Sequence, residues 1–96
     1  MQHVFEITDE SGRKIRLTQE RWQHILKHKG IEQRLEDIKK AVLNPTTITT
    51  HRYDENRRNY YLYYKERKRY LLVAVKYLNG EGYVSTAFMT RKILKR

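Results

Sequence analysis

The chain has 96 residues, no cysteine, and 21 lysines and arginines against 11 aspartates and glutamates, which gives a formal net charge of +10. This length predicts one domain over residues 1–96, and the lack of cysteine excludes a disulfide framework and a thiolate metal site. No apolar run approaches the ~20 residues that span a bilayer. Residues 1–10 also lack the pattern of a signal peptide, so we expect a cytoplasmic protein. The excess of positive charge favours a nucleic acid as partner.

The first 30 residues predict a hairpin followed by a helix. Alternation over His3–Ile7 and Lys14–Leu17, around the turn signal Asp9–Gly12, is typical of a short β-hairpin. Thr18 is a suitable helix N-cap because its hydroxyl can accept a bond from an orphan amide. The helix is expected to run to about Lys29.

A second helix is expected to follow Gly30 at once, because apolar residues recur there with helical spacing. Its apolar face consists of Ile31, Leu35, Ile38 and Val42. Asn44–Pro45 closes the segment, since proline cannot continue a helix.

The rest of the chain predicts β-structure, because β-branched and aromatic residues dominate it. The four expected strands cover Thr46–Arg52, Tyr60–Lys65, Arg69–Leu78 and Tyr83–Thr90. We therefore predict an α+β fold: an N-terminal β-hairpin and two helices packed on one face of a four-stranded antiparallel sheet.

The turn signal Asn79–Gly82 sets the expected register of the last two strands. A tight turn centred on Gly80–Glu81 would place Lys76 opposite Ser85 and Val75 opposite Thr86. Alternation then assigns Leu71, Val73, Val75, Val84, Thr86, Phe88 and Thr90 to one face, and Ala74, Lys76, Ser85 and Ala87 to the other. The first face is expected to receive both helices.

The strongest functional signal is the segment RWQHILKH, residues 21–28. At about 100° per residue, Arg21, His24 and His28 form one stripe beside the apolar Trp22 and Ile25. Imidazole can exchange protons near neutral pH, and the guanidinium fork matches phosphate oxygens. These groups suit chemistry on a phosphodiester, although an amphipathic helix can carry the same residues merely at the border of its core.

Cleavage of RNA by its own 2′-hydroxyl requires a base, an acid and groups that stabilise charge on the phosphate. His24 and His28 can serve as base and acid, and Arg21 as a phosphate clamp. Thr86 and Thr90 can donate hydrogen bonds, and Phe88 offers a surface for base stacking. This chemistry needs neither a metal nor a cofactor.

Zinc binding is the competing interpretation of the two histidines, because His24 and His28 have the i, i+4 spacing of a helical zinc site. The glutamate of the H-E-x-x-H motif is missing, since position 25 is isoleucine. The sequence therefore favours a site without metal.

Four further residues are candidate substrate contacts, each with a structural alternative. Lys76 interrupts an apolar strand, so it can meet a phosphate or point to solvent. Tyr61 belongs to a tyrosine-rich strand that suits base stacking as well as sheet packing. Arg57 and Arg58 lie in the expected polar loop Asp54–Asn59, where they can contact a substrate or be part of a solvated turn.

The pattern as a whole resembles the phage-type members of the barnase/EndoU/colicin/RelE-like nuclease superfamily over most of the chain. The residues that carry the resemblance are Arg21, Trp22, His24, Ile25, His28, Pro45, Ile48, Tyr60, Tyr61, Thr86, Ala87, Phe88 and Thr90. In this chain Lys29–Gly30 stands where many such relatives have Pro-Glu, and Phe88 stands where tyrosine is common.

The resemblance implies a small metal-independent ribonuclease, with tRNA as an expected substrate. It also implies a role as the toxin of a toxin–antitoxin or phage-related system, neutralised by an acidic antitoxin or immunity protein. By similarity to colicin-like relatives, His24 and Thr86 take the positions of a catalytic helix histidine and a catalytic strand hydroxyl.

We therefore expect an RNA endonuclease in which the first helix lies over the last strand, so that His24 and Thr86 share a pocket. Two alternatives use the same positive charge without catalysis. One is a nucleic-acid-binding module, whose affinity would fall steeply with salt. The other is a protein-interaction domain that meets an acidic partner.

Overall fold

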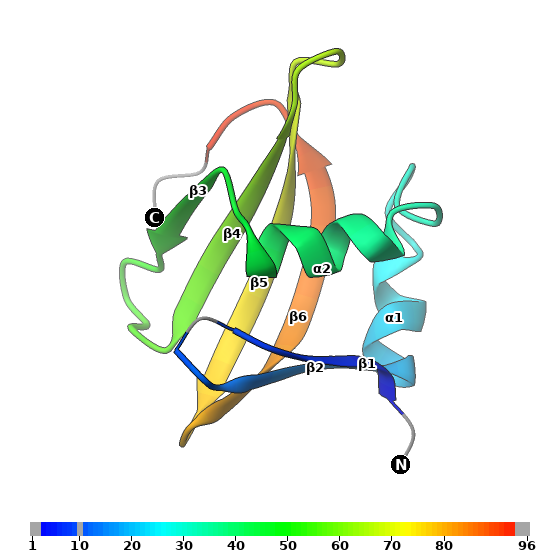
Figure 1. Ribbon diagram of the computed structural model, residues 1–96. Helices are drawn as coiled ribbons and strands as arrows, with labels where there is room; N and C mark the ends of the chain where they lie inside the picture. Colours follow the sequence, from blue (N-terminus) through cyan, green and yellow to red (C-terminus); the bar gives the residue numbers. More distant parts are fainter. Residues whose placement is uncertain (1–2, 10, 94–96) are drawn as a thin grey trace.

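A six-stranded mixed sheet and two helices form the computed structural model, which describes residues 3–9 and 11–93 (Figure 1). The elements are β1 (His3–Thr8), β2 (Lys14–Thr18), α1 (Gln19–Ile25), α2 (Leu35–Leu43), β3 (Thr47–Thr50), β4 (Arg57–Tyr64), β5 (Arg69–Leu78) and β6 (Glu81–Thr90). The strands lie in the order β1-β2-β6-β5-β4-β3. Helix α2 crosses one face of the sheet, and α1 lies beside β6. No helix of the described residues is both long and apolar enough to cross a membrane.

The N-terminal hairpin is confirmed, but the four-stranded antiparallel sheet is a wrong prediction. Strand β2 pairs in parallel with the start of β6, so the hairpin extends the sheet to six strands. Gly82 of β6 pairs with Ile15 of β2, and a side chain would not fit at this position. A Cβ there would lie 2.8 Å from the carbonyl oxygen of Lys76 and 3.1 Å from the Ile15 side chain. An ion pair of 3.1 Å between Arg16 of β2 and Glu81 of β6 also joins the two strands. Residue Glu10 of the hairpin turn lies outside the described residues.

The first helix begins as predicted and ends early. The Thr18 hydroxyl accepts a hydrogen bond from the Arg21 amide at 3.2 Å, as expected of an N-cap. Helix α1 ends at Ile25 instead of about Lys29, because the amides of residues 27 and 28 bond to carbonyls three residues back, which tightens the chain. His28 therefore lies in a turn after the helix.

The second helix begins later than predicted. It starts at Leu35, after a turn at residues 31–34, and not directly after Gly30. Ile31 is nevertheless fully buried, so its place in the apolar pattern reflects the core and not the helix. Helix α2 ends at Leu43, just before the predicted stop at Asn44–Pro45.

The main core lies between α2 and the sheet. It contains buried residues from every strand except β3, and from both helices, such as Ile25, Ile38, Val73 and Ala87. The opposite face of the sheet carries only a small cluster of Tyr61, Leu72 and Ala74, against which Tyr70, Phe88 and Ile93 pack. We call this second side the helix-free face.

The register of β5 and β6 differs from the prediction and changes the assignment of faces. The turn is the two-residue Asn79–Gly80, whose φ angles of 28° and 85° fit the twist of a tight hairpin. Lys76 therefore pairs with Tyr83, and Val75 with Val84. Beyond that pair the register shifts by one residue at Ser85, a β-bulge, whose hydroxyl donates to the Ala74 carbonyl at 3.2 Å.

The bulge reverses the faces of the residues that follow it, because one extra residue turns an alternating strand over. Ala87, not Thr86, faces the main core opposite Val73. Thr86, Phe88 and Thr90 consequently belong to the helix-free face, contrary to the prediction.

Strand β4 starts at Arg57, three residues earlier than predicted, so Arg57–Asn59 belongs to a strand and not to a loop. A short turn before the strand is held by the Asp54 carboxylate, which accepts from the Asn56 amide at 3.0 Å. The Asn56 carbonyl in turn accepts from the Tyr77 amide at 2.7 Å, which fixes the turn against β5.

Candidate active site

Polar side chains gather on the helix-free face around a small hollow next to Thr86. The hollow is lined by His51, Arg57, Asn59, Leu72, Ala74, Thr86 and Phe88. Its volume of about 70 Å³ is well below the ~300 Å³ at which ligand pockets begin, so a nucleobase can lie across its mouth but not inside it.

His51 has a defined orientation in this hollow. Its Nδ1 accepts a hydrogen bond from the Tyr53 amide at 3.1 Å, so the proton of the neutral ring is carried by Nε2. This imidazole and the Thr86 side chain line the same hollow.

A second hollow collects three cations at the start of β6. It is lined by Arg21, Asp54, Arg57, Lys76, Tyr83 and Ser85. Lys76 donates a hydrogen bond to the Asp54 carboxylate, and this bond is the main reason why the pKa of Asp54 lies below its usual value. Arg57 lines both hollows, so the two are neighbours on this face.

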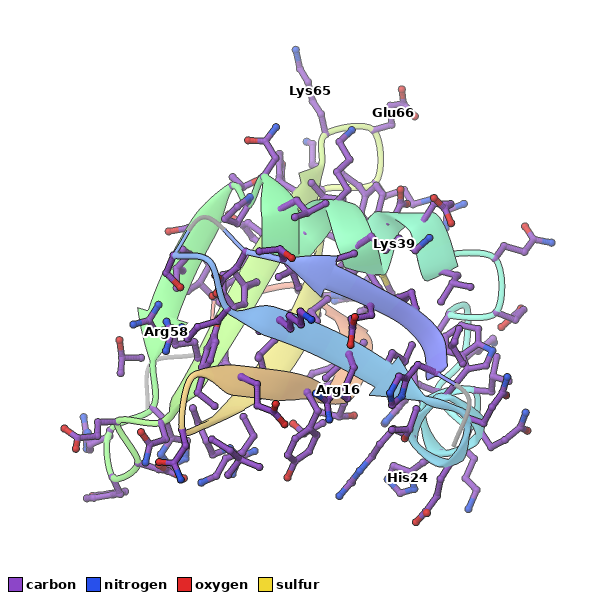
Figure 2. All side chains as sticks on the ribbon, turned by 60° about the horizontal axis from the view of Figure 1, so that its bottom comes forward. Arg16, His24, Lys39, Arg58, Lys65 and Glu66 are labelled. Atoms are coloured by element: carbon purple, nitrogen blue, oxygen red, sulfur yellow. The ribbon has the colours of Figure 1, made fainter. Side chains whose placement is uncertain are left out.

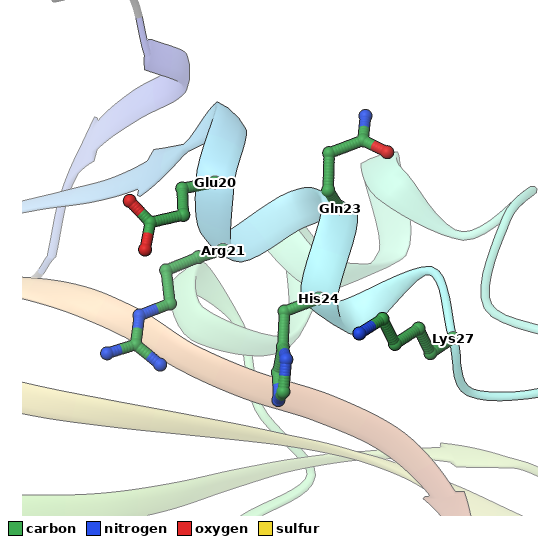
Figure 3. Close-up of a pocket in the computed structure, with 5 residues that line it drawn as sticks. All are labelled: Glu20, Arg21, Gln23, His24 and Lys27. Carbon is green, nitrogen blue, oxygen red and sulfur yellow. The ribbon is translucent and has the colours of Figure 1, made fainter.

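The first helix places the RWQHILKH residues along one rim of this face. Arg21 and His24 project to the same side of α1, whereas Gln23 points the opposite way (Figure 3). These residues line a third hollow, together with Glu20 and Lys27. We call Arg21, His24 and His28 the α1 rim.

Two contacts join the α1 rim to the helix-free face. The Arg21 guanidinium lies 5.6 Å from the ring centre of Tyr83. The His28 ring lies 5.7 Å from that of Phe88. Helix α1 and the turn after it therefore run along β6 from Tyr83 to Phe88, and Arg21 lines both the second and the third hollow.

The structure thus brings most of the predicted site residues to one side of the sheet, but not in the predicted pairs. His24 and Thr86 line different hollows, which are connected through Arg21 and Arg57. Of the two predicted histidines, His28 contacts the strand that carries Thr86, through Phe88.

Three predicted substrate contacts lie elsewhere or are occupied. Tyr61 is fully buried, and its ring centre lies 5.9 Å from that of Tyr70 in an edge-to-face arrangement. Its ring therefore cannot stack on a base. Arg58 belongs to the opposite face, 5.2 Å from the Tyr77 ring, and lies far from His24 (Figure 2). Thr90, at the end of β6, donates to the carbonyl of Lys92 at 3.2 Å.

Sequence reasoning missed His51, Asp54 and Tyr83 as members of this site. The strand register is the observation that could have identified them. Lys76 pairs with Arg57 on one side and with Tyr83 on the other, which brings Tyr83 and the segment before β4 to the same part of the sheet. The predicted register missed this pairing because it centred the turn on Gly80–Glu81, one residue beyond the observed turn at Asn79–Gly80.

A metal cluster is not formed by the residues in the described ranges: no three histidine, aspartate or glutamate side chains gather there. The early end of α1 also removes the helical i, i+4 geometry of His24 and His28 on which the zinc interpretation depended.

Comparison with known proteins identifies the family of this chain. The family described as phage-Barnase-EndoU-ColicinE5/D-RelE like nuclease 2 matches residues 3–96, which confirms the resemblance inferred from the α1 rim and the last strand. Neither the curated proteins nor the solved structures give a match.

Proposed function

Because the chain belongs to the phage-Barnase-EndoU-ColicinE5/D-RelE like nuclease 2 family, we propose that it is a metal-independent RNA endonuclease whose active site is the helix-free face and the α1 rim. The observation that carries this proposal is the contact of His28 with Phe88, which brings an imidazole to the edge of a face rich in cations. The net charge of +10 supports a polyanionic substrate.

The chemistry that these groups support is attack of a ribose 2′-oxygen on the adjacent phosphorus. The O2′–P bond forms, the P–O5′ bond breaks, and the products are a 2′,3′-cyclic phosphate and a 5′-hydroxyl. His24 and His28 take the proton from O2′ and give one to O5′. Arg21, Arg57 and Lys76 stabilise the negative charge that develops on the phosphate oxygens.

The hollow beside Thr86 positions the substrate in this proposal. The Thr86 hydroxyl donates a hydrogen bond to a phosphate oxygen, and the half-buried Phe88 ring stacks against a base that lies across the hollow. In this arrangement the RNA strand runs along β6, and the α1 rim borders the RNA on the side of α1.

We further propose tRNA as substrate and a role as the toxin of a phage-related or toxin–antitoxin system. An acidic antitoxin or immunity protein would cover the same cations that bind the phosphate. The support for these finer assignments is the resemblance together with the strongly basic composition.

The proposal is tested by incubating total tRNA with the protein in EDTA and examining the ends of the products. His24→Ala and His28→Ala should each reduce cleavage by about 10²- to 10⁴-fold, the usual contribution of a general acid or base. Gln19→Ala is the matched control, because this exposed residue belongs to the same helix and lines none of the described hollows. Equal activity of the parent and both histidine variants would reject the assignment.

Two other outcomes would change the conclusion in defined ways. If His51→Ala caused a larger loss than either rim variant, the proton transfer would belong to the hollow beside Thr86. If RNA bound with a steep salt dependence and was not cut, the protein would be a nucleic-acid-binding module instead of an enzyme.

A further inference from the structure

A separate basic hollow lies at the end of the molecule near the β4–β5 turn. Its volume is about 410 Å³, and it is lined by Lys29, Gly30, Arg34, Arg67, Arg69 and Met89. Four of these six residues carry positive charge, and none carries negative charge. It shares no lining residue with the hollows of the candidate active site.

Arg34 is held in a fixed position in this hollow. Its Nε donates to the Gly30 carbonyl at 2.9 Å, and its guanidinium lies 4.6 Å from the ring centre of Tyr64. Asp37 lies 3.8 Å from the guanidinium and also accepts a hydrogen bond from the Tyr64 hydroxyl at 2.5 Å. A planar guanidinium held on several sides loses little entropy when it binds a phosphate.

The hollow lies directly across β6 from the candidate active site. Phe88 faces the helix-free side, and its neighbour Met89 lines the basic hollow. Likewise His28 contacts Phe88, whereas the next residue, Lys29, lines the basic hollow. A strand of RNA that ran along β6 and passed its end would therefore meet these cations next.

We propose that this basic hollow binds backbone phosphates of the RNA outside the scissile phosphodiester. The inference rests on the proposed function, because it takes the direction of the RNA from the helix-free face. The hollow then favours long RNA over short fragments and holds the substrate in register with the α1 rim.

The composition of the hollow favours RNA over an acidic protein. The energetically important centres of protein interfaces contain aromatic and other apolar side chains, whereas Met89 is the one large apolar residue that lines this hollow. The exposed tip of the neighbouring β4–β5 turn carries Lys65 beside Glu66, so these two residues together add no net charge (Figure 2). Closely spaced cations with few apolar contacts suit the regular charges of a phosphate backbone.

The test measures binding of a labelled 2′-O-methyl oligonucleotide, which lacks the 2′-hydroxyl and cannot be cut by the proposed reaction. The dissociation constant is followed against KCl for the parent and for Arg67→Gln/Arg69→Gln. Each phosphate contact on a single strand contributes about 0.7 to the slope of log K against log salt, so the double variant should lower the slope by about 1.4. Lys14→Gln/Lys40→Gln removes the same charge from exposed residues outside all described hollows and should lower it far less.

A second variant guards against loss of folding, since Arg69 is part of β5. Lys29→Gln/Arg67→Gln changes only exposed turn residues and should lower the slope by a similar amount. Cleavage adds an independent measurement: the preference of the enzyme for a long RNA over a dinucleotide should fall in both hollow variants and persist in the control.

The proposal is overturned if the hollow variants and the control pair lower the slope equally, since the effect would then come from the total charge of the protein and not from the hollow. It is also overturned if the slope does not change, and an acidic protein then becomes the occupant to examine. Absence of any cleavage would reject the proposed function but leave the binding result interpretable, because the oligonucleotide is never cut.

Discussion

Lys76 on β5 donates a hydrogen bond to the carboxylate of Asp54, which precedes β4, in the same hollow as Arg21 and Arg57. Both side chains of this pair are more than a quarter exposed, so the contact is open to a ligand. The Asp54 carboxylate is therefore bound to Lys76 at the place where the proposed mechanism puts a phosphate oxygen. Asp54 would have to release Lys76 when the substrate binds.

We predict that Asp54→Asn tightens binding of RNA by about two- to five-fold, the scale of a partly exposed ion pair, because Lys76 loses an anionic competitor. The change should act mainly on KM. Glu55→Gln, which removes the same charge from the exposed neighbouring residue, is the control.

The effect of Asp54 should depend on pH in a defined direction. The hydrogen bond from Lys76 lowers the pKa of Asp54, so the carboxylate stays charged throughout the neutral range and competes there. The difference between parent and variant should disappear only when the pH falls below the usual range of aspartate. Weaker binding by Asp54→Asn at neutral pH would show that Asp54 positions Lys76 for the phosphate instead of competing with it.

Phe88 should contribute to binding through its aromatic ring. Phe88→Leu keeps an apolar side chain against Leu72 and Ala74 but removes the stacking surface. Since base stacking on an aromatic ring contributes ~1–3 kcal/mol, affinity for RNA should fall by about 5- to 150-fold. Phe88→Tyr should retain it, and equal affinity of the leucine and tyrosine variants would exclude stacking at this position.

Asp9 should make the fold sensitive to acid. Its side chain is buried, and it accepts hydrogen bonds from Ser11, from the Arg13 amide at 3.0 Å and from the Tyr77 hydroxyl at 3.1 Å. Burial alone would raise the pKa of Asp9, but these hydrogen bonds outweigh it, and the net pKa is lowered. A carboxyl whose pKa is lower in the folded state stabilises the fold above its unfolded-state pKa and loses that effect as the pH falls through the folded-state value.

We therefore predict that Asp9→Asn destabilises the protein by about 1–3 kcal/mol at neutral pH, the cost of unsatisfied buried partners. The difference from the parent should shrink below about pH 4, where the unfolded-state carboxyl is already protonated. Urea unfolding at several pH values measures it. A difference that is constant with pH would show that the charge of Asp9 does not matter.

Gly82 should be intolerant of any side chain. A Cβ would lie 2.8 Å from the Lys76 backbone oxygen, and this atom cannot move without disturbing the β5–β6 pair. Gly82→Ala should cost about 1–3 kcal/mol, as overpacking of a core usually does. An unchanged urea midpoint would mean that β5 and β6 can move apart at this position at no cost.

The local pattern of the sequence determined much of this protein. The hairpin, the N-cap at Thr18 and the extent of Arg69–Leu78 are readable from it, because capping and alternation act between near neighbours. Membership of the nuclease family is readable as well. The α1 rim was identified in the same way, although its helix is shorter than the pattern indicated.

Only the tertiary structure decided how these parts form a site. The parallel pairing of β2 with β6 joins segments distant in the chain, and no local pattern records such a contact. The bulge at Ser85 moves Thr86 and Phe88 to the helix-free face, because a period of two reverses with a single added residue. The tightened turn after Ile25 then brings His28 to Phe88, since its direction is set by packing against β6 and not by helical periodicity.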